Sequence, residues 1–269
     1  MGKLLKWIGI IFVVLMIIGF LAGNDKNSTE NTNLNKLTNE NTSNNESKSK
    51  YALNDKENTV LNYLLEEELN LFIQGEDTLL QNGLIVVSSN EVAKAYEDNQ
   101  VGADQKYYKK MLYLKGRVES INSGLGNEPY LALNGSNQFL NPQVHFDEPN
   151  IDKISNIKKG EVFTFVCVGN GSIVGTPMFK DCVFAEDYAN TRIAEIRKDI
   201  DRVLNGSKNK LEDSIRVLVI SLHLAKVLPE NAKCFTDKTA CEEEINLAMK
   251  DIKEADLLLV AKELKDKIK

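Results

Sequence analysis

The sequence opens with an uncharged apolar run from Trp7 to Gly23, preceded by Lys3 and Lys6. Its length is close to the roughly 17–25 residues that a helix needs to cross a bilayer. A charged side chain at the membrane centre would cost about 2.5–3.5 kcal/mol, and this run has none. Basic residues before the run favour a cytoplasmic N-terminus. We therefore predict that residues 1–23 are a single-pass transmembrane signal anchor, with the bulk of the chain periplasmic or otherwise extracytoplasmic.

The same run could instead be a cleaved signal peptide. Cleavage needs small residues in an A-x-A-like pattern. The first small residue of this pattern would be Phe20 for cleavage after Ala22, or Leu21 for cleavage after Gly23. Both residues are bulky. Asn24 stands where a lipoprotein would carry its lipid-bearing Cys. These residues favour a retained anchor and leave a cleaved signal peptide as the alternative.

Residues 24–58 have the composition of a disordered tether. Eleven of these 35 residues are Asn, and the segment contains no Pro, Phe, Val or Ile. Such a segment cannot bury enough apolar area to offset the entropy that it would lose on ordering. A flexible spacer of this length has a mean span of about 30–35 Å. We expect it to hold a folded domain clear of the membrane.

The charge balance disfavours nucleic acid as a partner. The 269 residues contain 33 Lys+Arg against 39 Asp+Glu, for a net charge of -6. Residues 88–186 contain 10 Lys+Arg and 12 Asp+Glu, and 10 minus 12 gives a net charge of -2. A groove that follows a phosphate backbone normally has a clear basic excess. Export would also separate the protein from most cellular nucleic acid.

Residues 59–87 are predicted to contain an amphipathic helix, from Thr59 to Gln81. Apolar residues recur there at three-to-four spacing around Glu66, Glu67 and Glu68. The helix could pack on the next domain or dock a partner. Ser88 with Glu91 three residues later fits a capping box, which predicts a second helix to about Asn99.

The pattern then changes to period 2. Between Met111 and Ile121, apolar residues and Gly116 alternate with Tyr113, Lys115 and Arg117, as in a strand with one buried face. Further strands are predicted at 130–134, 143–146, 161–168 and 178–185, with a short helix at 150–157 and a turn at Gly169–Ser172. Five short strands with a helix between the third and fourth are typical of an OB-fold barrel.

Helical patterns return after Glu186, at 193–204, 211–227 and 242–268. The predicted fold class is α+β: an N-terminal transmembrane helix, a five-stranded OB-fold β-barrel with a leading helix, then an α-helical C-terminal module. The predicted domains are the anchor (1–23), the tether (24–58), the amphipathic helix (59–87), the OB-fold domain (88–186) and the helical module (187–269).

Residues 90–184 resemble a known bacterial family. The matching stretches are NEVAKAYEDNQVGADQKYYKKMLYLKGRVESI, PYLALNG, KKGEVFTFVCVG and FKDCVF. They are similar to the tRNA-anti-like family, a group of OB-fold domains in exported membrane or lipoprotein-type proteins. The resemblance implies an OB barrel and export, and it leaves the ligand open.

The four cysteines separate into two pairs. Cys167 and Cys182 lie on consecutive predicted strands, and Cys234 and Cys241 lie close together between helices. Outside the cytosol such pairs favour disulfides, with buried free thiols as the alternative. The sequence lacks the CxxC spacing and the partner histidines that would indicate a zinc site.

We find no catalytic constellation in the sequence, and no cofactor is predicted. There is no phosphate-binding Gly-rich loop, no Gly-x-Ser-x-Gly and no His-Glu-x-x-His. The candidate ligand site is instead the outward face of the barrel, because aromatic rings interleaved with cations suit stacking and anion contact. Its predicted residues are Tyr113, Lys115, Arg117, Tyr130 and His145. The alternative interpretation is an ordinary solvated barrel face.

The sequence thus predicts a non-enzymatic, membrane-anchored, extracytoplasmic OB-fold protein that binds a protein, a peptide or a small envelope ligand. The alternative is an exported oligonucleotide- or oligosaccharide-binding protein that uses the barrel face. A third and weaker hypothesis is an envelope enzyme whose active site the sequence does not reveal.

Overall fold

The computed structural model describes residues 51–146, 151–207, 212–237 and 240–268. The anchor predicted at 1–23 and the tether up to residue 50 lie outside these residues. Within the described ranges, no helix combines the length and the apolar character needed to span a membrane. The chain divides into two compact units. We call 67–193 the barrel unit, and 51–66 with 194–268 the helical unit.

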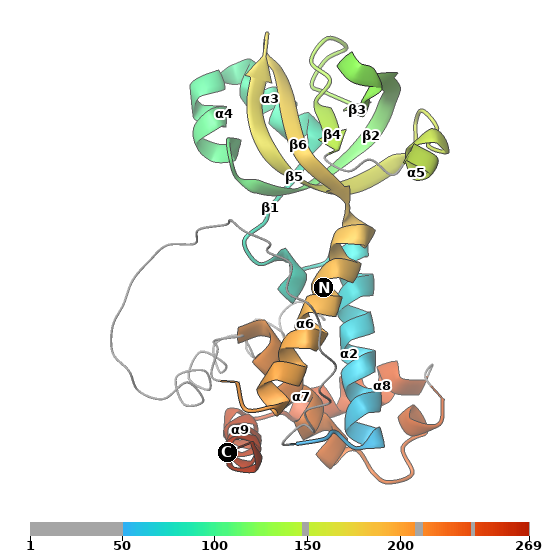
Figure 1. The fold of residues 1–269 in the computed structure, drawn as a ribbon, viewed down its shortest axis with the longest axis vertical. Coiled ribbons are helices and arrows are strands. Elements are labelled where there is room, and N and C mark those ends of the chain that lie inside the picture. The colour runs from blue at the N-terminus through green and yellow to red at the C-terminus, as the bar shows by residue number, and fades with distance from the viewer. Residues whose placement is uncertain (1–50, 147–150, 208–211, 238–239, 269) are drawn as a thin grey trace, which may run out of the picture. The chain divides into compact units, whose positions relative to one another are not determined.

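The barrel unit contains one six-stranded sheet. Its strands are β1 (Ile85–Ser88), β2 (Met111–Ser123), β3 (Pro129–Leu133), β4 (Gln143–Phe146), β5 (Val162–Ile173) and β6 (Thr176–Phe184). The last five close into a barrel in the order β2-β3-β4-β6-β5, with β5 paired back to β2 (Figure 1). The β4–β6 pair is parallel and the other four barrel pairs are antiparallel. The predicted five-stranded barrel is therefore confirmed.

Short helices support the barrel. They are α3 (Ser89–Asp98), α4 (Gln100–Tyr107) and α5 (Ile151–Ser155). The capping box predicted at the start of α3 is present, because Ser88 Oγ accepts from the Glu91 N–H and Glu91 accepts from the Ser88 N–H. The helix predicted between the third and fourth barrel strands is α5.

The segment before the barrel differs from the prediction. Helix α2 runs from Asp55 to Gln74, so it begins inside the stretch predicted to be tether and ends before Gln81. A second capping box explains the early start: Asn54 Oδ1 accepts from the Glu57 N–H, and the Asn54 N–H donates to Glu57. Ile85–Ser88 is not helical but forms β1, which pairs in parallel with β2.

The predicted turn at Gly169–Ser172 is also different. Strand β5 continues through it to Ile173, with a register shift against β6 between Gly169 and Ser172. Gly171 has a φ of +75°, which suits a bulge. A Cβ at Gly169 would lie 2.1 Å from the carbonyl oxygen of Tyr107, so only glycine fits there. These glycines allow a long, bent strand rather than ending it.

Aromatic rings fill part of the barrel core. Phe165 is fully buried, with its ring centroid 5.2 Å from Phe184, 6.0 Å from Phe146 and 6.2 Å from Phe163. Cys167 and Cys182 form a disulfide between β5 and β6, and both cysteines belong to this core. The interior of the barrel is thus occupied by side chains, as is usual in small barrels.

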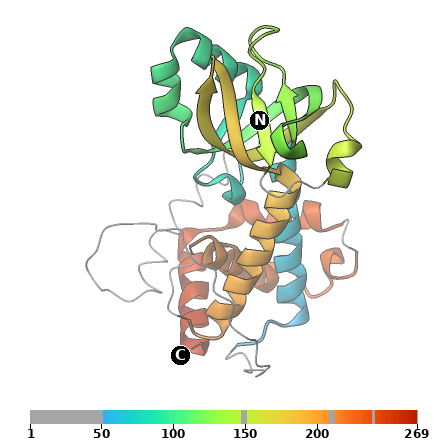
Figure 2. The same cartoon turned by 45° about the horizontal axis from the view of Figure 1, so that its top comes forward.

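The helical unit is built around α7 (Glu212–Val227), which is buried on all sides from Ser214 to Ala225. Its other helices are the first part of α2, the second part of α6 (Ala185–Leu204), α8 (Cys241–Ala248) and α9 (Glu254–Lys267). Figures 1 and 2 show α2 and α6 side by side, and Arg197 donates to Asn62 between them. A second disulfide joins Cys234 to Cys241.

Candidate functional site

Two predicted site residues meet on the outer face of the barrel. Tyr130 on β3 is the direct cross-strand partner of His145 on β4. Their rings are stacked, with centroids 5.0 Å apart and planes 13° apart. The neighbouring Leu131 and Val144 point into the core with no exposed surface. Because side chains alternate along a strand, the Tyr130–His145 stack must face outward.

Uncharged polar side chains surround this stack. Asn122 on β2 is the partner of Tyr130 on its other side, and Gln143 Oε1 lies 3.3 Å from His145 Nε2. Asn122 donates to Ser120 Oγ at 2.9 Å. These residues form two adjacent rows across three strands, which we call the β3–β4 face: Asn122, Tyr130 and His145, then Ser120, Ala132 and Gln143.

The β3–β4 face carries no lysine or arginine. Partial burial lowers the pKa of His145 below its ordinary value, although the Glu128 carboxylate raises it in part. The imidazole is therefore neutral at pH 7, when it can both donate and accept a hydrogen bond. Together with two amides and a hydroxyl, it gives a surface suited to hydroxyls and ring faces rather than to phosphates.

Tyr113 does not reach a ligand face. It points away from the barrel interior as the alternation predicts, but the end of α2 covers it and leaves it 2% exposed. Its ring meets Phe72 edge-on at 4.9 Å, and its hydroxyl donates to the Phe72 carbonyl. Burial raises the pKa of this hydroxyl. Tyr113 thus attaches α2 to the barrel.

Lys115 and Arg117 are exposed but lie apart from the stack. Both are on the first half of β2, paired with Thr164 and Val162 of β5. Arg117 donates to the carbonyl of Gly160 at 2.9 Å. Arg117 and Asn122 are five positions apart, which corresponds to about 16 Å along β2. The structure therefore brings together two of the five predicted residues.

Sequence reasoning missed Ser120, Asn122 and Gln143. Gln143 lies two residues before His145, so the period-2 pattern that selected His145 would also have selected it. The β2 residues were harder to assign, because a register shift between Val118 and Ser120 changes which residues face outward. No local signal in the sequence marks that shift.

Among the described residues, no group of three or more His, Cys, Asp and Glu side chains could hold a metal ion. His223 lies on α7 in the helical unit, and burial lowers its pKa.

A match to a protein-family model agrees with this fold. The chain matches the model of the tRNA_anti-like family over residues 1–183. No curated protein matches it. A solved structure from Klebsiella pneumoniae, described as a "putative nucleic acid-binding lipoprotein", is 16% identical to the chain, with a TM-score of 0.31. The similarity covers 37% of this chain and 91% of the Klebsiella chain.

The family match extends beyond the resemblance found at residues 90–184 and covers more than half of the 269 residues. It includes every strand of the barrel except the last residue of β6. This chain belongs to the tRNA_anti-like family.

Proposed function

We propose that the chain is a non-enzymatic, exported binding protein whose barrel binds an oligomer on the β3–β4 face. The Tyr130–His145 stack is the observation that carries this proposal. It lies on the second and third strands of the barrel, which OB folds commonly use to bind oligonucleotides and oligosaccharides. Both rings are half-buried, so part of each remains available to a ligand.

The chemistry of the face favours an oligosaccharide. Asn122, Gln143 and the neutral His145 offer hydrogen bonds to hydroxyl groups, while Tyr130 offers an apolar ring surface. Glu128 is close enough to raise the pKa of His145, and its negative charge would repel a phosphate. A neutral ligand meets no such penalty.

A single-stranded oligonucleotide is the second candidate. Lys115 and Arg117 are exposed on the same barrel and could contact phosphates of a strand that extends from the stack along β2. In that arrangement bases would stack on Tyr130, as in other proteins that bind single strands.

Two observations support export. The chain contains two disulfides, which are typical of proteins outside the cytosol. Its apolar residues 7–23 could anchor it to a membrane. A protein in that location would meet envelope polymers.

The test measures binding of two probes to the full chain in lipid nanodiscs. The probes are a neutral chitin-type hexasaccharide and a single-stranded oligothymidylate. We expect Tyr130→Ala to weaken binding of the hexasaccharide roughly 5- to 150-fold, because loss of a stacking ring removes about 1–3 kcal/mol. Tyr108→Ala is the matched control, since Tyr108 is an exposed tyrosine of the barrel unit outside this face.

The second half of the test separates the two ligands. If oligothymidylate binds instead, its affinity should fall steeply with added salt and with Lys115→Ala combined with Arg117→Ala. Equal binding by the Tyr130→Ala and Tyr108→Ala proteins would reject the β3–β4 face. Failure of both probes to bind would reject the oligomer and favour a protein or peptide ligand.

A further inference from the structure

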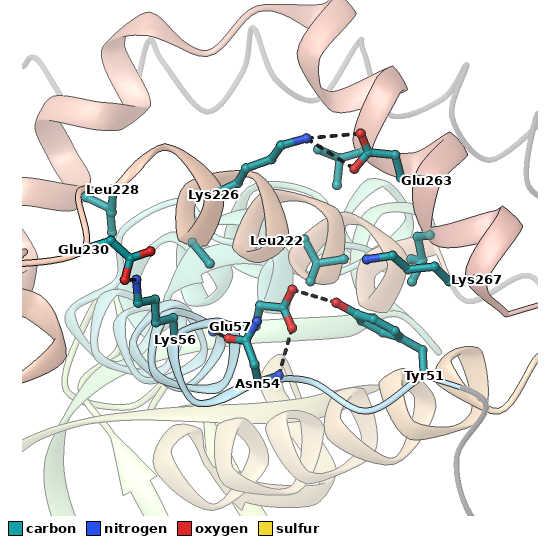
Figure 3. Close-up of a pocket in the computed structure, with 13 residues that line it drawn as sticks. Tyr51, Asn54, Lys56, Glu57, Leu222, Lys226, Leu228, Glu230, Glu263 and Lys267 are labelled. Carbon is teal, nitrogen blue, oxygen red and sulfur yellow. Dashed lines mark hydrogen bonds and ion pairs between the residues drawn. The ribbon is translucent and has the colours of Figure 1, made fainter.

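The helical unit contains a cavity of about 380 Å³ between the start of α2, the end of α7 and α9 (Figure 3). This volume lies within the usual range for small-molecule sites, about 300–1,000 Å³. Its apolar lining comes from α7, the residue that follows α7, and α9: Leu222, Ala225, Leu228, Val260 and Leu264. The opposite wall is polar and includes Tyr51 and the first turn of α2.

The carboxylates of this cavity already have partners. Lys226 pairs with Glu263 at 3.1 Å, and Lys56 pairs with Glu230. Glu57 accepts the Tyr51 hydroxyl at 2.6 Å and the Asn54 N–H at 2.9 Å. Figure 3 shows these contacts around the rim. The two ion pairs neutralise the charges of Lys56 and Lys226, which are two of the three lysines that line the cavity.

Lys267 is the third lysine. Its Nζ lies 4.6 Å from the centroid of the Tyr51 ring, a cation–π contact. Figure 3 shows the ammonium group pointing into the cavity toward Leu222. Among the described residues, no carboxylate lies within ion-pair distance of it. In the described part of the chain, the cavity therefore presents one cation without a carboxylate partner next to an apolar surface.

This combination defines a chemical class of ligand. We infer that the cavity binds a small monocarboxylate with an apolar tail, whose carboxylate pairs with Lys267. The tail would contact Leu222, Val260 and Leu264. A lysine ammonium is a point charge that suits a single anionic group. A phosphate would bring more negative charge close to Glu57, Glu230 and Glu263, so one carboxylate fits better.

The probe is hexanoate, compared with neutral hexanamide of the same length. Calorimetric titration of the full chain in nanodiscs, with empty nanodiscs as reference, should show saturable hexanoate binding at least tenfold tighter than hexanamide binding. Lys267→Gln should weaken hexanoate at least tenfold. Lys262→Gln is the matched control, because Lys262 is exposed on the same helix and does not line the cavity.

A second variant tests the apolar end. Ala225→Met should fill part of the cavity and weaken hexanoate without touching Lys267. Thermal melting of each variant shows whether it is folded. Three results would each overturn the inference: no saturable hexanoate binding, equal affinity for hexanamide, or wild-type affinity in the folded Lys267→Gln protein. None of them bears on the β3–β4 face, because the variants leave the barrel residues unchanged.

Discussion

The barrel unit and the helical unit fill their cores with different side chains, and so they offer different kinds of site. Three phenylalanines surround Phe165 in the barrel core, so only the outer surface of the barrel is open to a ligand. The core around α7 is mainly aliphatic, and a cavity remains where α2, α7 and α9 meet. A closed sheet thus presents a face, and a helical bundle encloses a pocket.

The largest expected effect comes from the two cores. Phe165→Ala should lower the free energy of unfolding by about 3–5 kcal/mol, because it removes a fully buried ring. Leu218→Ala on α7 should lower it by about 2–5 kcal/mol. Urea denaturation followed by circular dichroism measures both.

Amide hydrogen exchange then shows where each core variant acts. In the Phe165→Ala protein, exchange should accelerate most in β2, β5 and β6, and in the Leu218→Ala protein it should accelerate most in α7. Uniform acceleration through the whole chain in both variants would contradict the division into two separate cores.

The two disulfides should contribute unequally to stability, and the one in the barrel unit should contribute more. Cys167 and Cys182 are 15 residues apart, whereas Cys234 and Cys241 are seven apart. By the loop-entropy relation, removing the first bond with Ser at both positions costs about 3 kcal/mol and removing the second costs about 2 kcal/mol. Urea denaturation of the two double variants shows which disulfide contributes more to stability. The reverse order would show that loop length is not the main term here.

Local sequence patterns predicted much of the barrel. The alternation from Leu112 to Val118 gave β2, and the pair Ser88 and Glu91 gave the start of α3. Both signals depend on residues within one turn or one strand. The pairing of Cys167 with Cys182 followed once the strands were placed, because neighbouring strands bring the two together. Cys234 and Cys241 are only seven residues apart in the sequence.

The missed features depend on contacts between distant residues. Strand β1 contains only Ile85, Val86 and Val87 as apolar residues, and it becomes a strand by pairing with β2. Tyr113 looked like a surface residue because nothing near it in the sequence shows that Phe72 covers it. Which side chains of β2 face outward likewise depends on how its first half pairs with β5 and its second half with β3.

The two capping boxes should have equal and smaller effects. Ser88→Ala removes the cap of α3 in the barrel unit, and Asn54→Ala removes the cap of α2 in the helical unit. Each should cost about 1 kcal/mol, since the freed N–H groups lose their partners. Thermal unfolding of the two variants compares them. A difference of more than about 1 kcal/mol between the two would show that one cap supports contacts beyond its helix.

The smallest expected effect is a pH dependence of folding stability, to which both histidines contribute. Burial lowers the pKa of His145, against the Glu128 carboxylate, and lowers that of His223, against Asp256 and aided by Lys226. Below the ordinary value of 6.5 the unfolded chain takes up these protons before the folded chain does. Stability is therefore complete above pH 6.5 and decreases as the pH falls toward the lowered values.

Denaturation between pH 7.5 and about pH 5.5 measures this slope. His145→Gln and His223→Gln should each remove part of it, and the double variant should remove most of it. A slope that is unchanged in the double variant would assign the effect to carboxylates instead.

The position of β1 also bears on edge-to-edge association between copies of this chain. In the described sheet, every barrel strand has neighbours on two sides, whereas β1 is paired with β2 alone. An open strand edge is a template for another chain. This one is only four residues long, so an incoming strand could form few hydrogen bonds with it. Closing the barrel and ending the sheet on so short a strand leaves little backbone for edge-to-edge polymerisation.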